Sequence, residues 1–367
     1  MVERTLINHR IYIKFLLIVL AIISTTLLFS TCTPSSTDTE TNKNDSETSK
    51  EVDAESFADK LAADFPTDIA FSRDKMFFTE KSGRLKVVQK GRRQAKKLKE
   101  FSVPSQLGYN EIGLLGIALS PDFENDKKIY LYHTYESDGE LLNRVISIDS
   151  DQPENDPKVI IDGIKGNRIH DGGKLAFGPD RKLYIATGDA GDKSTAQDRE
   201  SLNGKVLRVD PDGTIPSDNP FSNAVWSIGH RNIFGMTFDD SGRLFVTENG
   251  PEKDDEINEI KRGANYGWPD VTGVTKRSLD NPIITIERSI APTGIIFYQG
   301  DKFQDLKGHL IFADFVKGDI HEIDFSVPGK VSQKVIANVS QGVNAIAASP
   351  DGGIYVATED KVKKIEF

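Results

Sequence analysis

The chain has 367 residues, of which 37% are hydrophobic and 28% are charged, as is typical of a soluble globular protein. Its net charge of -10 argues against nucleic acid as a partner, because binding to a phosphate backbone needs a basic surface. The single cysteine, Cys32, excludes an internal disulfide and any CxxC zinc or redox motif. The fold must therefore be held by packing and sheet hydrogen bonds, with bound ions as a further source of stability.

Residues 1–32 have the form of a targeting segment. A basic start, 1–14, precedes an uncharged apolar run, Phe15–Phe29, which is shorter than the roughly 20 residues of a spanning helix. Cys32 closes this run as in a lipoprotein cleavage box, although Thr31 is not the usual small residue. Lipidation, plain cleavage and an uncleaved anchor all remain open. Each of them predicts a protein outside the cytoplasm, secreted or tethered to a membrane.

Residues 33–57 are rich in Ser, Thr, Asp, Glu and Asn, which predicts a disordered polar linker, because so few apolar groups cannot form a core. A short helix is expected over Glu55–Ala63. A basic run over 90–99 is interpreted as a solvated hairpin or loop, with a binding patch as the alternative.

The rest of the chain, 58–367, repeats one pattern six times. Each copy has a short apolar strand, a polar turn and a second strand of alternating apolar and polar residues. The turn residues lie 48 to 61 residues apart, at Ser72, Ser120, Gly178, Asp239, Gln299 and Ser349. Each interval has room for about four short strands, which is one propeller blade. The sequence therefore predicts an all-β, six-bladed β-propeller of four-stranded antiparallel blades.

The final segment, KVKKIEF, is expected to pair with the chain before Thr67 and close the ring, which removes exposed sheet edges. A pair of β-sandwiches is the alternative fold. It explains six copies in one register less well.

Five segments between the repeats combine polar residues with glycines, which suits close approach of backbone to a ligand. They are 110–116, 166–173, 188–192, 226–232 and 248–258. His170, in the second segment, is a candidate general base, although a loop histidine is more often a plain surface residue. The acidic fifth segment offers oxygen ligands of the kind that calcium prefers, with a solvated acidic loop as the alternative.

At these segments the sequence resembles the soluble quinoprotein glucose/sorbosone dehydrogenase family, which includes the aldose sugar dehydrogenases. The resemblance covers about residues 60–367 and rests on six motifs in one order: NEIGLLGIALSPDF, HDGGKLAFGPDRKLYIATGDAG, GHRNIFG, ENGPEKDDEIN, GANYGWP and SIAPTG. It implies a six-bladed propeller that holds pyrroloquinoline quinone (PQQ) and Ca²⁺ over the channel mouth. It also implies oxidation of aldose sugars to lactones at the anomeric carbon, with electrons passed to an external acceptor such as a quinone or cytochrome.

The resemblance also implies roles for individual residues. His170 would take the proton of the anomeric hydroxyl as a hydride passes to the quinone, and Arg231 and Asn232 would contact the quinone oxygens. Further cofactor contacts are implied for Glu111, Asp189, Ser289 and Lys317. The implied metal ligands are the carbonyls of Gly250 and Pro251 for the cofactor's calcium, with Glu256 and Tyr266 for a structural calcium.

One departure from the family is prominent. The last blade of the family begins with an Arg-x-Arg-Asp stretch whose arginines pair with cofactor carboxylates, whereas this chain has Ser340–Asn344 without an arginine. Lys317, Arg168 or Arg288 are candidates to compensate. Two other functions therefore stay open: a cofactor-less propeller that binds glycans or proteins, and a calcium-dependent lactonase.

Overall fold

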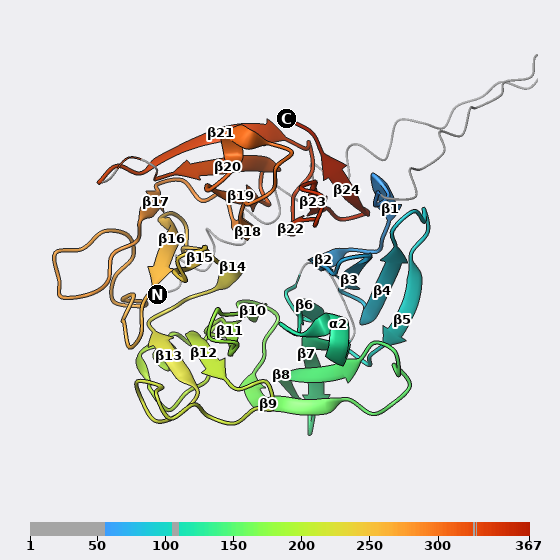
Figure 1. The fold of residues 1–367 in the computed structure, drawn as a ribbon. Coiled ribbons are helices and arrows are strands. Elements are labelled where there is room, and N and C mark those ends of the chain that lie inside the picture. Colours follow the sequence, from blue (N-terminus) through green and yellow to red (C-terminus); the bar gives the residue numbers. More distant parts are fainter. Residues whose placement is uncertain (1–55, 105–109, 326, 328) are drawn as a thin grey trace, which may run out of the picture. The chain divides into compact units, whose positions relative to one another are not determined.

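The computed structural model describes residues 56–104, 110–325, 327 and 329–367. The expected targeting segment, 1–32, and nearly all of the expected linker lie outside these residues. Within them, six four-stranded antiparallel sheets stand around a central axis (Figure 1). This arrangement confirms the predicted six-bladed β-propeller.

The strands of blades one to three are β2 (Pro66–Phe71), β3 (Lys75–Glu80), β4 (Arg84–Gln89), β5 (Lys96–Glu100), β6 (Leu114–Leu119), β7 (Lys128–Ser137), β8 (Glu140–Asp149), β9 (Lys158–Lys165), β10 (Gly172–Phe177), β11 (Leu183–Thr187), β12 (Lys205–Val209) and β13 (Val225–Ile228). Those of blades four to six are β14 (Ile233–Phe238), β15 (Leu244–Glu248), β16 (Asp255–Ile260), β17 (Ile284–Ile286), β18 (Pro292–Phe297), β19 (Leu310–Asp314), β20 (Asp319–Asp324), β21 (Ser332–Asn338), β22 (Ala345–Ala348), β23 (Ile354–Ala357) and β24 (Lys361–Ile365), completed by β1 (Lys60–Ala62). The described residues contain little helix: α2 (Phe123–Asp126) and the 3-10 turns η1 (Lys193–Gln197) and η2 (Gln304–Leu306). Among these residues we find no helix long and apolar enough to cross a membrane.

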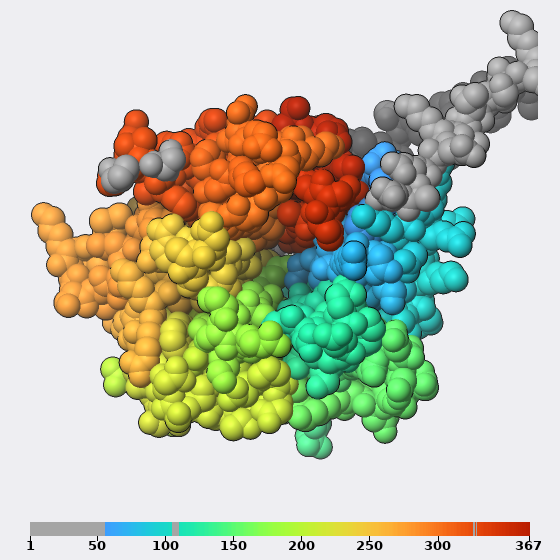
Figure 2. Space-filling model, in the orientation of Figure 1, coloured from blue at the N-terminus to red at the C-terminus, as the bar shows by residue number. Residues whose placement is uncertain are grey.

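The ring is closed by the two ends of the described chain. β1 is the outer strand of the last blade, and Leu61 pairs with Val362 of β24, as the sequence predicts. The first and last blades are therefore neighbours, and Figure 2 shows the first and last colours meeting on the ring surface. The helix expected over Glu55–Ala63 is wrong for the described residues, because β1 occupies 60–62. Leu61 is 3% exposed and fills the core between blades one and six, which an extended strand permits.

The hydrophobic core is divided into six clusters, each between two neighbouring blades. Because every blade is covered on both faces, its second strand has no solvent side. β11, β15 and β19 are buried at all five positions, instead of alternating as the sequence pattern predicts. Polar residues on these strands are buried too: the Thr247 hydroxyl donates to the Thr293 carbonyl at 2.5 Å, across to the next blade.

The inner strands are irregular at one end. The pairing of β2, β6, β10, β14 and β18 with its neighbour shifts register near the first residues of each strand. Bulges of this kind bend a strand and turn its side chains in a new direction. At this end of the channel the segments singled out from the sequence come together.

Candidate active site

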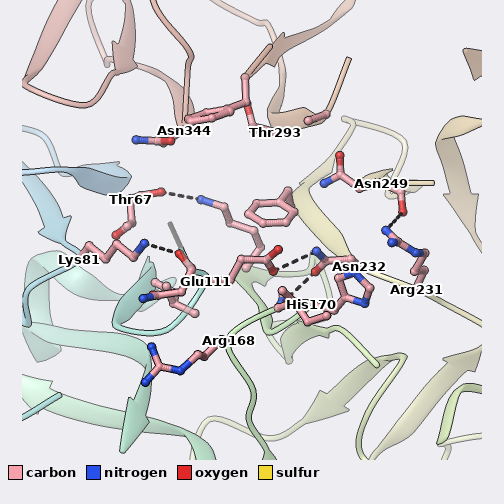
Figure 3. Close-up of a pocket in the computed structure, with 18 of the residues that line it drawn as sticks. Thr67, Lys81, Glu111, Arg168, His170, Arg231, Asn232, Asn249, Thr293 and Asn344 are labelled. Carbon is pink, nitrogen blue, oxygen red and sulfur yellow. Dashed lines mark hydrogen bonds between the residues drawn. The ribbon is translucent and has the colours of Figure 1, made fainter. Parts of the chain in front are cut away.

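A cavity of about 390 Å³ lies at the bulged end of the channel (Figure 3). All six blades contribute to its wall, through Thr67, Leu115, Gly172, Asn232, Thr293 and Asn344 in chain order. Of the predicted site residues, Glu111, His170, Arg231, Asn232, Gly250 and Ser289 line it. These residues are therefore brought to one site, although the outermost two, Glu111 and Ser289, are 178 residues apart in sequence (289 minus 111).

His170 stands at the cavity wall with its side chain 15% exposed. Its Nδ1 lies 2.7 Å from Oδ1 of Asp189, and no described residue forms a hydrogen bond with its Nε2. The backbone at His170 is left-handed, with φ of 59°, and its carbonyl lies where a Cβ on Gly188 would approach to 2.0 Å. Glycine at 188 therefore allows the GDAG turn to lie against the His170 backbone.

Asp189 is fully buried behind His170 and does not line the cavity. Its Oδ1 accepts the backbone N–H of Gly191 at 2.8 Å, and its Oδ2 accepts the indole N–H of Trp268 at 2.8 Å. Burial alone would raise the pKa of Asp189, but the hydrogen bonds from His170, Trp268 and Gly191 outweigh it and hold this pKa below its usual value. An ionised Asp189 accepts the Nδ1 proton of His170, so that Nε2 is left as a base facing the cavity.

Glu111 and Asn232 line the cavity beside the His170 segment (Figure 3). Asn232 donates from Nδ2 to Oε2 of Glu111 at 3.0 Å and accepts the Gly172 N–H at 3.2 Å. Glu111 also accepts the Asp171 N–H at 3.1 Å. Burial raises the pKa of Glu111, against the opposing effects of Asn232 and His170. This carboxyl is therefore poised to carry a proton at a pH where an exposed glutamate would be ionised.

Arg231 reaches the cavity from the start of blade four. Its backbone N–H donates to Oε1 of Glu248 at 2.6 Å, and its Nη1 donates to the Asn249 carbonyl at 3.0 Å. The guanidinium lies 5.4 Å from the Trp268 ring centroid. Its buried Nε has no partner among the described residues. The site therefore holds a fixed cation with an unused donor.

Two lysines that sequence reasoning missed also line the cavity. Lys174, on inner strand β10, is 7% exposed; its Nζ donates to the Thr67 carbonyl and pairs with Asp68, each at 3.0 Å. Lys81 donates to the Asn110 carbonyl, and burial lowers its pKa. Lys174 could have been found from the sequence, because it is the one charged residue in the otherwise apolar inner-strand motif GKLAF. With Arg168 and Arg231, these lysines give the cavity four cations, which suits an anionic ligand.

Asp255 organises the wall between blades four and five. This buried carboxylate accepts the N–H groups of Gly250, Ile290 and Ala291 at 2.7 to 3.0 Å and the hydroxyl of Ser289 at 3.1 Å. Ser289 therefore lines the cavity with its hydroxyl already engaged.

Two predicted residues of this region do not line the cavity. Pro251 is exposed beside Gly250. Lys317 is exposed at the β19–β20 turn, where its N–H donates to Asp314 at 2.7 Å. Of the residues proposed to compensate for the absent arginines, only Arg168 lies at the cavity, and Arg288 does not. Asn344, from the segment without arginine, forms part of the wall and donates to the Pro66 carbonyl at 3.0 Å.

A second, much smaller cavity of about 10 Å³ adjoins Arg231 and contains Glu256 and Tyr266 in its wall. Glu248 and Asp254 border it as well, and the buried Oδ1 of Asn249 there has no partner among the described residues. Burial and the nearby Glu248 raise the pKa of Glu256 to about 7. Carboxylates crowded around one ion-sized space, with an unsatisfied amide oxygen, match the ligand chemistry of Ca²⁺.

Tyr266 takes a different position from a side-chain ligand. Its hydroxyl donates to the Glu259 carbonyl at 2.6 Å and accepts the Lys261 N–H at 2.9 Å. Its ring stacks on His230, with 4.8 Å between centroids. The hydroxyl is therefore occupied, and the backbone N–H donates to the Ile228 carbonyl, so the backbone carbonyl is the group that Tyr266 can offer a metal ion. A further cluster, Asp314, Asp319 and His321, lies within blade five, and none of its residues lines either cavity.

The family model described as Glucose / Sorbosone dehydrogenase matches residues 63–366. The chain belongs to this family. It is 33% identical over 343 residues to the aldose sugar dehydrogenase YliI of Escherichia coli strain K12, covering 84% of this chain and 90% of that protein. It is 38% identical over 194 residues to quinoprotein glucose dehydrogenase B of Acinetobacter calcoaceticus, covering 44% of this chain and 40% of that protein.

Solved structures agree with this assignment. The PQQ-bound aldose sugar dehydrogenase of Streptomyces coelicolor superposes with a TM-score of 0.72 at 29% identity, over 86% of this chain and 96% of that chain. The apo-form of the soluble aldose sugar dehydrogenase of Escherichia coli gives 0.71 at 30% identity, over 82% and 96%. The resemblance seen in the six motifs is thus confirmed at the level of the family.

Proposed function

We propose that this protein is a PQQ-dependent aldose sugar dehydrogenase, which oxidises an aldose to the lactone and passes the electrons to an external acceptor. The observation that carries the proposal is the His170–Asp189 pair, whose free Nε2 faces a cavity lined by four cations. The PQQ-bound relative from Streptomyces coelicolor and the quinoprotein from Acinetobacter support the choice of cofactor.

The residues at the cavity fit such a cofactor. PQQ is a flat molecule with three carboxylates and an ortho-quinone, and it needs cations at its edge. Arg168 would pair with the carboxylates, together with the Nζ–H groups of Lys81 and Lys174 that their bonds to Asn110, Thr67 and Asp68 leave over. Arg231 and Asn232 would contact the quinone oxygens. Lys81 and Lys174 offer a replacement for the arginines absent from 340–344. The unused Nε of Arg231 is a donor that a bound oxygen would satisfy.

The chemistry of the reaction would be divided between cofactor and protein. Bound PQQ would supply the acceptor for the hydride that leaves the anomeric carbon. Nε2 of His170 would take the anomeric hydroxyl proton, since Asp189 holds the ring with this nitrogen unprotonated. Asp189 would stabilise the imidazolium that forms. The positive charge of Arg231 would stabilise negative charge on an oxygen at the same wall.

Calcium would have two places. The Gly250 backbone borders the main cavity, and its carbonyl, with that of the adjacent Pro251, is the proposed ligand pair for the ion beside the cofactor. The small cavity at Glu256 is the proposed structural site, with Glu248 and Asp254 as further oxygen donors and Tyr266 contributing through its backbone.

We place the enzyme outside the cytoplasm, secreted or tethered by residues 1–32. A location there is consistent with an aldose substrate taken from outside the cell and with an acceptor such as a quinone or cytochrome. A cofactor-less binding propeller is the second candidate, because Asn344 lines the cavity where the family has arginine pairs.

The test is dye reduction by the purified protein with PQQ, Ca²⁺ and a panel of aldoses. We expect activity that His170→Ala abolishes. His309→Ala is the matched control: His309 also lies 2.7 Å from a buried carboxylate, that of Glu322, but it does not line the cavity. Aldose-independent dye reduction, or equal loss in both variants, would count against the proposal. PQQ that fails to bind at micromolar concentration would favour the cofactor-less alternative.

A further inference from the structure

A dense run of positive charge lies at the outer edge of blade one, on an otherwise acidic protein. The turn between β4 and β5, together with β5, carries six cations and no carboxylate from residue 89 to residue 99: Lys90, Arg92, Arg93, Lys96, Lys97 and Lys99. We call these six residues the basic edge. The net charge of the whole chain is -10, so the basic edge has the opposite sign to the chain as a whole.

Most of the basic edge is not neutralised by ion pairs within the described residues. Lys97 pairs with Glu100, and Lys99 donates to the carbonyls of Pro153 and Asn155. Arg92, Arg93 and Lys96 are exposed, and none of them forms an ion pair or a side-chain hydrogen bond within the described residues. Three adjacent, unpaired cations repel one another unless an external anion lies among them.

These three cations border a groove of about 720 Å³. Its other wall includes Lys75, and its floor is apolar, formed by Phe77, Val87 and Leu98. The groove is therefore a cationic rim over an apolar base. A phosphate group attached to a hydrocarbon chain matches both parts, whereas a small hydrated anion uses only the rim.

The groove lies at the opposite end of the blade from the active site. The first residue of β3, Lys75, lines the groove. Lys81, which directly follows the last residue of β3, lines the active-site cavity. A strand of this length separates the two openings by roughly 17–20 Å. A surface bound at the groove would therefore leave the cavity open on the far side.

The basic edge also adjoins the point where the described chain begins. The Gly91 N–H donates to the Ser56 carbonyl at 2.8 Å, and Nζ of Lys90 lies 5.6 Å from the Phe57 ring centroid. Phe57 is 1% exposed, so this junction is fixed in the core. Figure 1 shows β1, which follows Phe57, beside the first blade. Any anchor within residues 1–55 is thus connected to the propeller next to the basic edge.

We propose that the basic edge binds an anionic phospholipid surface, with headgroup phosphates between Arg92, Arg93 and Lys96. Stable attachment to a bilayer commonly needs two signals, for example a lipid or short apolar segment together with a polybasic patch. Here the polybasic patch is the basic edge, and it lies beside Ser56 and Phe57, through which residues 1–55 join the propeller. The membrane would then approach the propeller from the face opposite to the cavity, which stays accessible to sugar and acceptor.

The test uses residues 56–367, because this stretch includes the closing strand β1 and all six core clusters and lacks the apolar run, Phe15–Phe29. We expect it to co-sediment with vesicles of equal parts phosphatidylglycerol and phosphatidylcholine at about 0.15 M salt, and not with phosphatidylcholine alone. A basic residue near an anionic membrane strengthens binding roughly five-fold, so Arg92→Gln/Arg93→Gln/Lys96→Gln should weaken it about 100-fold. The control removes three exposed cations from other blades, as Lys165→Gln/Lys193→Gln/Lys253→Gln, and should change binding little.

A second measurement checks orientation. Residues 56–367 contain no cysteine, so Gln94→Cys and, separately, Lys193→Cys provide single labelling sites for an environment-sensitive fluorophore. Anionic vesicles should shift the emission at 94 and leave that at 193 unchanged. Equal binding to both vesicle types, equal loss in the two triple variants, or a shift at 193 alone would overturn the proposal. So would a protein that binds soluble polyphosphate or an acidic protein but no vesicle. The assays need no PQQ, so the dehydrogenase proposal is tested separately.

Discussion

Replacing Asp189 with asparagine tests how the protein prepares its base. The carboxylate accepts three hydrogen bonds: from His170 and Gly191 at Oδ1 and from Trp268 at Oδ2. An amide can present oxygen to only one of these sides. If its oxygen faces His170, its NH₂ group meets the Trp268 N–H; if it is flipped, the NH₂ group meets Nδ1 of His170 and forces the proton onto Nε2.

Either orientation is costly. A buried donor left without an acceptor destabilises the fold by about 1–3 kcal/mol. In the flipped state His170 no longer offers a free base, and loss of a general base lowers rates by roughly 10²–10⁴. We therefore expect Asp189→Asn to reduce kcat by about that factor. PQQ affinity should change little, because Asp189 does not line the cavity.

The assay is steady-state dye reduction, with PQQ binding and the free energy of unfolding measured on the same samples. Asp192→Asn, an exposed acid in the same loop, is the control and should behave as wild type. The folded pKa of Asp189 is depressed, so its stabilisation is present above about pH 4 and is lost as pH falls through the folded value. The stability difference between wild type and Asp189→Asn should thus shrink in acid. A folded variant with unchanged kcat would refute the role given to Asp189.

Three further predictions follow from the same contacts. The folded pKa of Glu111 is raised, so its contribution to folding stability is complete below about pH 4 and is lost as pH rises through the folded value. In thermal melts Glu111→Gln should therefore be more stable than wild type at alkaline pH. A stability difference that stays the same at all pH values would contradict this. Lys81→Met should weaken PQQ binding roughly 10- to 150-fold, the equivalent of one charge-assisted hydrogen bond. Lys86→Met, on the neighbouring strand, should leave PQQ binding unchanged. Equal PQQ titration curves for the two variants would exclude Lys81 as a carboxylate partner. Ca²⁺ should raise the Tm of the apo-protein and a chelator should reverse this, with a clearly smaller shift in Glu256→Gln; the same shift in both proteins would remove Glu256 from the metal site.

The fold could be predicted from the sequence because the turn between the first and second strands recurs in every blade. The six turn residues from Ser72 to Ser349 each lie between the first and second strands of a blade, and the last strand pairs with the chain before Thr67 as expected. The alternation expected on the second strands failed because neighbouring blades cover both faces, as on β11. Periodicity reports exposure on one side of a sheet, and in a ring of packed blades such exposure is absent from the middle strands.

The site was predictable where a motif places a side chain on the cavity, as for His170, Arg231 and Asn232. It was not predictable where bulges redirect side chains or where a loop returns from a distance. Lys174 enters the cavity from a strand that reads as apolar, and Trp268 reaches Asp189 from 79 residues away. A motif also does not reveal which of its atoms is free: Tyr266 belongs to the expected metal segment, yet its hydroxyl bonds to backbone at Glu259 and Lys261.

The central claim is that aldose oxidation occurs at this cavity with bound PQQ. The most direct measurement mixes the purified protein, loaded with one equivalent of PQQ and Ca²⁺, with an excess of aldose in the absence of oxygen and dye, and records the absorbance of the cofactor. We predict rapid, stoichiometric reduction of the bound cofactor in the wild type and in His309→Ala, and none in His170→Ala. Failure to bind PQQ, or bound PQQ that no aldose reduces, would contradict the account.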